Sequence, residues 1–312
     1  MSEPRAALSA TVRGLIKLAR YREYVPFVFL TSLVGVKLAD APLDWRLPVV
    51  LMTNFLTVCF AFMINDIEDA ELDAQHPGKR LRNPVSSGEL ARPWAHTAAG
   101  VVAILTLLLG VLLGGWALLL VLAGLVLGWI YSWQALRLKA MPVADLISHT
   151  LMLAGIQFLV GYFSYAKGSW SIWPVLAAFM LFSAYGELYN ELHDFETDRA
   201  GGLHTTAVVL GRTVTQVLMY TFLVSSSVLV ALSIWQRLVP LEVVAIPVGV
   251  LLVVALRRPA RDARGQESLD FSGSLQVPAL MMINVTVIGW VISGYIGGWL
   301  VLVSSWLSHL ER

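Results

Sequence analysis

Two short stretches of this sequence hold side chains whose types and spacing are suited to binding metal ions. Ten of the chain's 21 acidic residues lie in them. They are Asp66, Glu68, Asp69, Glu71 and Asp73 in the first stretch, and Glu187, Glu191, Asp194, Glu196 and Asp198 in the second. Because like charges this close repel one another, we expect positive partners between them.

Both stretches carry one pattern, an Asn followed by an acid and then by Asp residues four and eight positions after the Asn. Steps of four place such residues on one face of a helix, so each stretch presents a row of oxygen atoms. We call Asn65, Asp69 and Asp73 the first row, and Asn190, Asp194 and Asp198 the second row. The alternative is that both stretches are only polar loops at helix ends.

Carboxylate and amide oxygens, without cysteine or clustered histidine, are the ligands that hard cations prefer. Mg²⁺ takes a few carboxylates, several waters and the phosphates of a substrate. Two opposed rows would therefore hold Mg²⁺ around a diphosphate. The predicted metal ligands are Asn65, Asp66, Asp69, Asp73, Asn190, Asp194 and Asp198. The side chains predicted to act in catalysis are Asp69, Asp73, Asp194, Asp198 and Lys139.

Basic side chains follow the first row and recur before the second. Lys and Arg take up phosphate charge, Arg through paired hydrogen bonds. The residues predicted to bind the diphosphate are Arg80, Arg82, Arg137 and Lys139 together with Tyr131, and Lys79 lies beside them. Taken alone, a short basic loop more often only marks the cytoplasmic side of a membrane. Next to two acidic rows, we favour the phosphate-binding interpretation.

The elements that position these residues are predicted to be membrane helices. Of the 312 residues, 57% are hydrophobic and 14% are charged, and the mean hydropathy is +0.71. Soluble domains carry about 25% charged residues, so a soluble enzyme fits poorly. About 20 apolar residues cross the hydrocarbon core as a helix. Such runs are found at 25–39, 46–64, 95–115, 116–133, 143–166, 171–190, 213–235, 238–256 and 275–295. The expected fold is an all-α integral membrane bundle of about nine transmembrane helices.

The distribution of positive charge predicts the orientation of this bundle. Most of the 22 Lys and Arg residues fall on the side of the N-terminus. Both rows and the N-terminus are therefore expected to be cytoplasmic, and the C-terminus outside, in an inner or cytoplasmic membrane. The segment 7–20 spaces apolar residues at helical intervals and is predicted to lie in the inner interface. We expect Arg20 and Arg22 to anchor it at lipid headgroups.

We predict a single membrane-embedded domain over residues 1–312. Because the two rows repeat one pattern, it is expected to consist of pseudo-repeat halves, 25–133 and 143–256, and a final helix, 275–295. The formal net charge of +1 gives no basis for a nucleic-acid partner. No obligate protein partner is evident, and the expected partners are membrane lipid and small substrates.

The motifs resemble those of a known family, the UbiA superfamily of intramembrane prenyltransferases. Residues 65–73, running on through 79–88, resemble its first aspartate-rich motif and the loop after it. Residues 194–202 resemble the second motif, and Tyr131-Ser132-Trp133 with Arg137-Leu138-Lys139 is similar to the segment after helix four. The resemblance covers essentially the whole chain. Departures from the commoner family forms are Asn83, Glu191 and His204.

The resemblance implies a helical bundle around a central cavity, with Mg²⁺ and a polyprenyl diphosphate at its cytoplasmic mouth. Metal or diphosphate roles carry over to Asn65, Asp69, Asp73, Asp194 and Asp198, and Asn190 follows from the internal symmetry. Loss of the diphosphate would leave an allylic cation, which an aromatic ring such as that of Tyr131 would stabilise. The acceptor would then capture that cation.

The expected function is thus Mg²⁺-dependent transfer of a prenyl group from a polyprenyl diphosphate to a small acceptor. The favoured acceptor is a 4-hydroxybenzoate-like aromatic or another lipid-quinone precursor. Nearer alternatives within the superfamily are prenylation of a non-aromatic lipid and a membrane terpene cyclase, which needs no acceptor. A transporter is the remoter alternative, because intramembrane acids also form ion relays.

Overall fold

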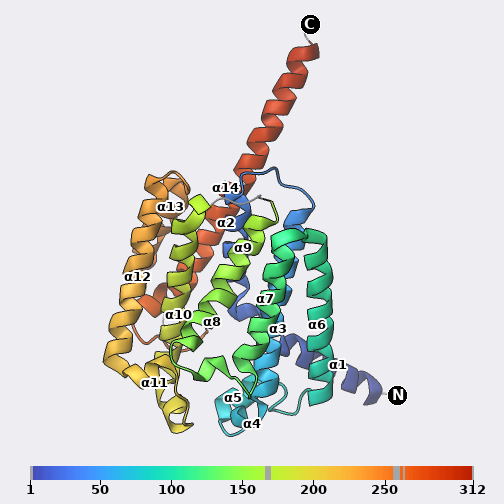
Figure 1. Cartoon of the computed structure of the whole chain (residues 1–312), viewed down its shortest axis with the longest axis vertical. Helices are drawn as coiled ribbons and strands as arrows, with labels where there is room; N and C mark the ends of the chain where they lie inside the picture. Colours follow the sequence, from blue (N-terminus) through green and yellow to red (C-terminus); the bar gives the residue numbers. More distant parts are fainter. Residues whose placement is uncertain (1–2, 166–169, 256–260, 263, 311–312) are drawn as a thin grey trace.

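The computed structural model describes residues 3–165, 170–255, 261–262 and 264–310, which form a bundle of helices (Figure 1). The helices that run along the bundle are α2 (Val25–Leu38), α3 (Arg46–Glu68), α6 (Arg92–Leu113), α7 (Gly115–Ser132), α8 (Ala144–Thr150) with α9 (Ile156–Phe163), α10 (Trp173–Ala200), α12 (Arg212–Trp235), α13 (Leu241–Ala255) and α14 (Phe271–Leu310). Each of the nine predicted runs coincides with one of these segments. Shorter helices at the end of the bundle are α1 (Glu3–Leu18), α4 (Ala70–Asp73), α5 (Pro77–Arg82) and α11 (Thr206–Leu210).

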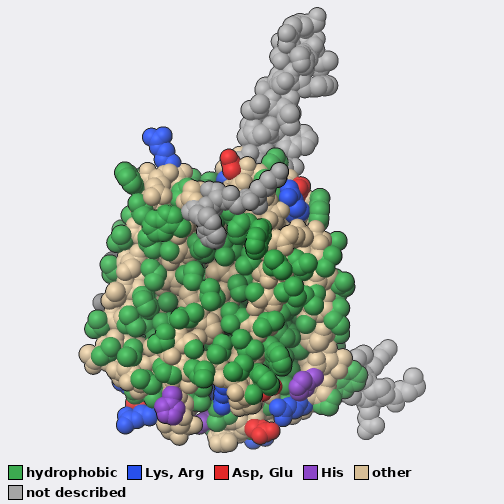
Figure 2. Space-filling view, viewed as in Figure 1, with side chains coloured by type: hydrophobic (Ala, Val, Ile, Leu, Met, Phe, Trp, Pro, Cys, Tyr) green, Lys and Arg blue, Asp and Glu red, His purple; other side chains and the backbone are tan. Residues whose placement is uncertain are grey.

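The surface is that of an integral membrane protein. Six of the described helical segments are long and apolar enough to cross a membrane, and two more are shorter apolar helices. Hydrophobic side chains cover the middle of the face shown in Figure 2, whereas charged side chains lie at its two ends. Large apolar residues such as Leu108 and Val228 are exposed. A helix satisfies its own backbone hydrogen bonds, so such a surface is stable in lipid.

Small residues bring α7 close to α3, which carries the first row. A Cβ atom on Gly124 would lie 2.8 Å from Cγ2 of Thr57, and one on Gly128 would lie 2.8 Å from Cβ of Ala61. Glycine at both positions therefore permits a contact that a larger residue would prevent. We call this contact of Gly124 and Gly128 with Thr57 and Ala61 the α3–α7 seam. It sets the distance between the first row and the end of α7.

Buried amides join α2, α3 and α9 in the interior. Nδ2 of Asn54 donates to Oγ of Ser32 and to the carbonyl oxygen of Gln157, each at 2.7 Å. Between α8 and α9 one π-helical turn, Leu151–Gly155, interrupts the regular helix. The side chain of Gln157 donates to the carbonyl oxygen of Met152 in this turn at 2.7 Å. Such bonds supply partners for polar groups that lipid would leave unsatisfied.

The two ends of the bundle differ. Helices α1, α4 and α5 lie at one end, and α14 leads to the C-terminus at the other (Figure 1). The predicted amphipathic segment is the helix α1, in which Leu18 is buried and Ile16 is exposed. The division into pseudo-repeat halves stays a prediction.

Candidate active site

One cavity of about 360 Å³ lies at the end of the bundle that holds α4 and α5, and both rows line it. Its volume falls within the range of about 300–1,000 Å³ that is usual for ligand pockets. All seven predicted metal ligands are among its lining residues: Asn65, Asp66, Asp69, Asp73, Asn190, Asp194 and Asp198. The chain therefore brings together two stretches that the sequence separates by more than 100 residues.

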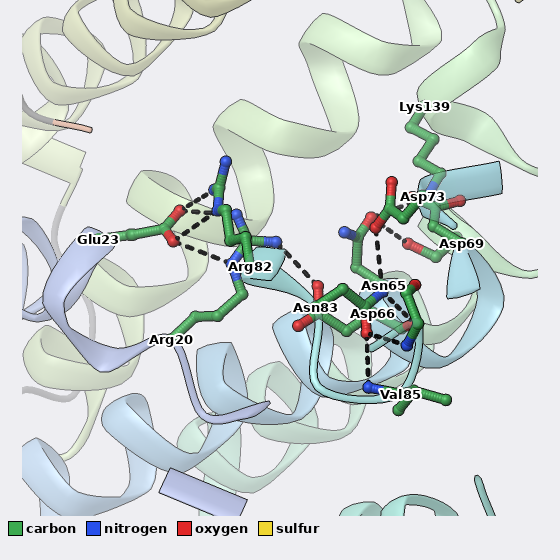
Figure 3. Close-up of polar contacts among 12 residues, drawn as sticks. Arg20, Glu23, Asn65, Asp66, Asp69, Asp73, Arg82, Asn83, Val85 and Lys139 are labelled. Atoms are coloured by element: carbon green, nitrogen blue, oxygen red, sulfur yellow. Dashed lines mark hydrogen bonds and ion pairs between the residues drawn. The ribbon is translucent and has the colours of Figure 1, made fainter. Parts of the chain in front are cut away.

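The first row crosses a join between two helices without losing its register. Helix α3 ends at Glu68 and α4 begins at Ala70. The backbone N–H of Asp69 nevertheless donates to the carbonyl oxygen of Asn65 at 3.0 Å, and that of Asp73 donates to Asp69 at 2.8 Å. This four-residue bonding keeps the row on one side (Figure 3). The second row lies wholly within α10, which continues ten residues beyond the predicted run.

Basic side chains pair with the first row. Nζ of Lys139 donates to Oδ2 of Asp69 at 2.5 Å and to Oδ1 of Asn65 at 2.7 Å (Figure 3). Nη2 of Arg137 donates to the other oxygen of Asp69 at 3.1 Å. Burial lowers the pKa of Lys139, and the charge of Asp69 opposes that shift. Burial raises the pKa of Asp73, and the hydrogen bond that Asn83 donates to its carboxylate opposes that shift.

The loop after α7 folds back and places Arg137 and Lys139 beside Asp69. Arg137 has a φ of 45°, in the left-handed region that non-glycine residues seldom adopt. Its backbone N–H donates to the carbonyl oxygen of Trp133 at 2.6 Å, which closes the turn. Such strained positions persist where surrounding contacts hold them. Here the contacts of Arg137 and Lys139 with Asp69 do so.

Basic side chains also reach the second row. Nη1 of Arg264 donates to Oδ2 of Asp194 at 3.1 Å, and Nζ of Lys79 lies 3.8 Å from Oδ1 of Asp198. Lys79 belongs to α5, which directly follows the first row, so this ion pair links the two stretches. The sequence offered no signal for the role of Arg264, which follows α13 and lies 70 residues from its partner.

The predicted diphosphate-binding residues divide into two groups. Arg82, Arg137, Lys139 and Tyr131 line the cavity. Arg80 is exposed and is not among the lining residues, so the structure does not bring this predicted residue to the site. The reason is helical spacing, because Lys79 and Arg82, three residues apart in α5, share the face from which Arg80 turns away.

The expected lipid anchor at Arg20 is wrong, because this side chain turns into the cavity wall. Nη1 of Arg20 lies 3.0 Å from Oδ1 of Asp66, and its Nη2 lies 2.7 Å from Oε2 of Glu23 (Figure 3). The same Glu23 oxygen lies 2.5 Å from Nη2 of Arg82. Asp66 is thus paired with Arg20 through Oδ1, while its Oδ2 is buried and has no hydrogen-bond partner among the described residues. A metal role for Asp66 stays a prediction.

Asn83 fastens the loop after α5 to the first row (Figure 3). Its Nδ2 donates to the carbonyl oxygen of Asp66 at 2.7 Å and to Oδ2 of Asp73 at 3.0 Å. Its Oδ1 accepts from the backbone N–H of Val85 at 2.9 Å. Asn83, which departs from the commoner family loop, therefore holds this loop to the first row, a role that the sequence alone did not reveal.

The donor set of this cavity suits a hard cation. As the side chains stand, no three His, Cys, Asp or Glu residues of the described part converge closely enough to hold a metal ion. Oxygens of Asn65, Asp69, Asp194 and Asp198 instead contact Lys or Arg side chains. Two buried carboxylate oxygens on the lining, Oδ2 of Asp66 and Oε1 of Glu191, have no hydrogen-bond partner among the described residues. Oxygen ligands of this kind fit Mg²⁺.

Residues 28–275 match the sequence pattern of the UbiA prenyltransferase family, and the chain belongs to that family. It is a membrane prenyltransferase that acts on polyprenyl substrates. Digeranylgeranylglyceryl phosphate synthase of Pyrococcus horikoshii is 24% identical over 244 residues, which are 76% of this chain and 85% of that protein. The bacteriochlorophyll synthase 33 kDa chain of Cereibacter sphaeroides is 27% identical over 264 residues, 81% of this chain and 85% of that protein.

The fold is shared with a solved member of the family. A UbiA homologue from Archaeoglobus fulgidus, determined with GPP and Mg²⁺ bound, matches with a TM-score of 0.71 at 22% identity. The match covers 90% of this chain and 99% of that one. The expected fold class and family are therefore confirmed.

Proposed function

We propose that this enzyme transfers a prenyl group from a polyprenyl diphosphate to a small acceptor, with Mg²⁺ held between the two rows. The observation that carries the proposal is that both rows and their basic partners line one cavity. Asn65, Asp69 and Asp73 would hold the ion on one side, and Asn190, Asp194 and Asp198 on the other. When bound, Mg²⁺ supplies positive charge that stabilises a departing diphosphate.

The basic lining residues are proposed to bind the diphosphate. They are Lys79, Arg82, Arg137, Lys139 and Arg264. Arg137 and Lys139 pair with Asp69, Arg264 pairs with Asp194, and Lys79 pairs with Asp198. With Mg²⁺ held by the rows, these basic side chains would be free to donate to phosphate oxygens, as would Arg82, and those hydrogen bonds would strengthen as charge builds on the leaving group. Heterolysis of the allylic C–O bond is thereby favoured.

The inner part of the cavity suits the prenyl chain and the allylic cation. Its lining includes Phe27, Phe62, Phe182, Tyr185 and Leu280. Apolar side chains exclude water, which would otherwise capture the cation. Aromatic faces stabilise a positive charge through their quadrupole, and Tyr131 adds a further ring.

We propose a 4-hydroxybenzoate-like aromatic or another lipid-quinone precursor as the acceptor, since an aromatic-lined cavity accommodates such a ring. A lipid glycerol phosphate is a second candidate, which the similarity to digeranylgeranylglyceryl phosphate synthase favours.

We further propose that the cavity end faces the cytoplasm and the C-terminus lies outside. The cluster of basic residues at the cavity end supports this orientation.

The test crosses donors with acceptors. The purified protein in lipid nanodiscs is given geranyl or geranylgeranyl diphosphate together with 4-hydroxybenzoate or an ether-linked glycerol phosphate with a free hydroxyl group. Diphosphate release and prenylated product are measured with Mg²⁺ and after chelation by EDTA. We expect turnover with Mg²⁺, its loss on chelation, and unchanged turnover in Arg92→Ala, an exposed basic residue of the same end.

Two results would contradict the proposal. A cyclic hydrocarbon formed from the donor without any acceptor would identify a terpene cyclase. Ion flux into sealed liposomes that hold the purified protein, without release of diphosphate, would identify a transporter.

A further inference from the structure

One group of cavity side chains lies outside the set of basic residues proposed to bind the diphosphate. It consists of Tyr131 on α7, His149 on α8 and Glu187 on α10, all of which line the cavity. The hydroxyl of Tyr131 donates to Oε1 of Glu187 at 3.1 Å. Nδ1 of His149 lies 3.0 Å from the other oxygen, Oε2. Three helices thus meet on one carboxylate.

Glu187 differs from the row carboxylates in its partner. Asp69, Asp194 and Asp198 each contact a Lys or Arg side chain. Among the described residues, the only ion-pair partner found for Glu187 is His149, whose imidazole carries a charge only when it is protonated. A carboxylate placed within a membrane bundle without a permanent cation is costly and marks a functional site. The pair is therefore suited to receiving a proton.

The group lies where the reacting carbon of the donor would be. Glu187 precedes Asn190 by about one helical turn in α10, on the side away from the cytoplasmic end. Tyr131 precedes Ser132, whose hydroxyl donates to Oδ1 of Asn65 at 3.1 Å. The group therefore adjoins the inner ends of both rows. The first carbon of a prenyl chain lies directly inward of its phosphates.

The surrounding contacts fix His149 in place. Asp145, one turn earlier in α8, accepts from the backbone N–H of Thr206 at 2.6 Å and from its hydroxyl at 2.5 Å. This ties α8 to the segment after α10. The π-helical turn begins two residues after His149, and such turns occur frequently at functional sites. A fixed imidazole is what proton transfer at a set position requires.

We propose that His149 is the base that takes the proton from the acceptor, and that Glu187 and Tyr131 hold it in the required state. A neutral imidazole with its proton on Nδ1, toward Glu187, leaves Nε2 free to accept. The allylic C–O bond breaks and its electron pair leaves with diphosphate. An electron pair of the acceptor forms the new bond to the allylic carbon, and the proton of the attacking group passes to Nε2. Glu187 stabilises the imidazolium.

This inference rests on the proposed function and narrows its substrate class. The acceptor must carry a proton on the attacking group, as a phenol, a phenolic ring carbon or an alcohol does. Proton transfer to His149 follows or accompanies attack on the cation. Loss of the base therefore impairs capture by the acceptor more than it impairs ionisation of the donor.

The experiment separates these two steps. Wild type, His149→Asn and Glu187→Gln are given geranylgeranyl diphosphate, Mg²⁺ and the two acceptors named above, and diphosphate release and prenylated acceptor are counted together. The control is His96→Asn, which changes an exposed histidine of α6. We expect both variants to lose about 10²-fold or more of acceptor transfer, the usual contribution of a general base, while diphosphate release stays within about threefold. The released chain should appear as prenyl alcohol.

Each other outcome contradicts the inference. Transfer that stays near the wild-type rate shows that His149 takes no proton. Equal loss of transfer and diphosphate release in both variants assigns the pair to donor binding or folding. Diphosphate release by the wild type without transfer to either acceptor also overturns it, yet leaves donor ionisation intact. Absence of diphosphate release by the wild type overturns the proposed function itself, and so does a cyclic hydrocarbon formed from the donor alone.

Discussion

The carboxylates of the two rows contribute charge at a polar opening and little packing. Asp69 contacts Lys139 and Arg137, and Asp198 contacts Lys79. Each of these partners belongs to a loop or to a short helix at the end of the bundle. Removing one carboxylate therefore takes away a cation ligand and leaves the helix contacts in place.

Asp69→Ala and Asp198→Ala are each expected to lower diphosphate release by about 10²-fold or more, because electrostatic stabilisation of the leaving group is lost. Diphosphate release is measured beside the thermal unfolding temperature in detergent, which should change little. If either variant kept most of the wild-type activity, the row carboxylate at that position would not hold the cation.

The individual contacts of the site were only partly accessible from the sequence. Spacing of four predicted which oxygens share a face, because that periodicity follows from helix geometry alone. The contacts of Arg20 with Asp66, and of Arg264 with Asp194, join residues 46 and 70 positions apart. They depend on how whole helices pack, which no local pattern encodes. The same is true of His149 and Glu187.

Among the helices, the junction of α1 with the bundle depends on a buried ion pair. The side chains of Arg20 and Asp66 are 12% and 2% exposed, and Glu23 links them to Arg82 on α5. The N-terminal helix is thereby fastened to α3 and to the loop that follows the first row. The segment that follows α1 thus becomes part of the cavity wall.

Arg20→Ala is expected to destabilise the fold by about 3 kcal/mol, because it leaves the buried Asp66 without its cation. The matched control is Lys17→Ala, whose partner Glu89 is exposed and whose ion pair contributes at most about 1 kcal/mol. Thermal unfolding in one detergent compares them. Equal effects of the two substitutions would mean that Arg20 is only a surface anchor.

The seam between α3 and α7 depends on glycine. A larger side chain at Gly128 would meet Ala61 one turn before Asn65, and the contact of Ser132 with Asn65 would open. Gly128→Leu is expected to cost about 1 to 3 kcal/mol and to lower activity in the remaining folded protein. Gly100→Leu on α6 is the control, since a Cβ there meets nothing within 4 Å. Unfolding midpoints and the activity per folded molecule are measured for both.

Wild-type stability and activity in Gly128→Leu would contradict this description of the seam.

Helix positions themselves followed from the sequence, because long apolar runs can only be helices in lipid. The interhelical distance did not, since it depends on which small residues face each other. The extension of α10 past its apolar run likewise required the structure.

Across the whole molecule, an apolar surface encloses a polar cavity at one end of the bundle. The surface was predictable from composition. The meeting of the rows was predictable because four of the predicted helices, an even number, lie between them and return the chain to the same side. The acceptor was not, because the shape of the cavity depends on side chains from many helices. Family relatives that are named for different products show that this fold serves more than one acceptor.

The most direct test is a structure of the protein with Mg²⁺ and a geranyl diphosphate analogue whose bridging oxygen is sulfur, which cannot ionise readily. We expect metal ions ligated by oxygens of both rows, with Lys139 and Arg137 turned from Asp69 onto the diphosphate. A diphosphate bound outside the cavity, or one that reaches residues of a single row, would contradict the account.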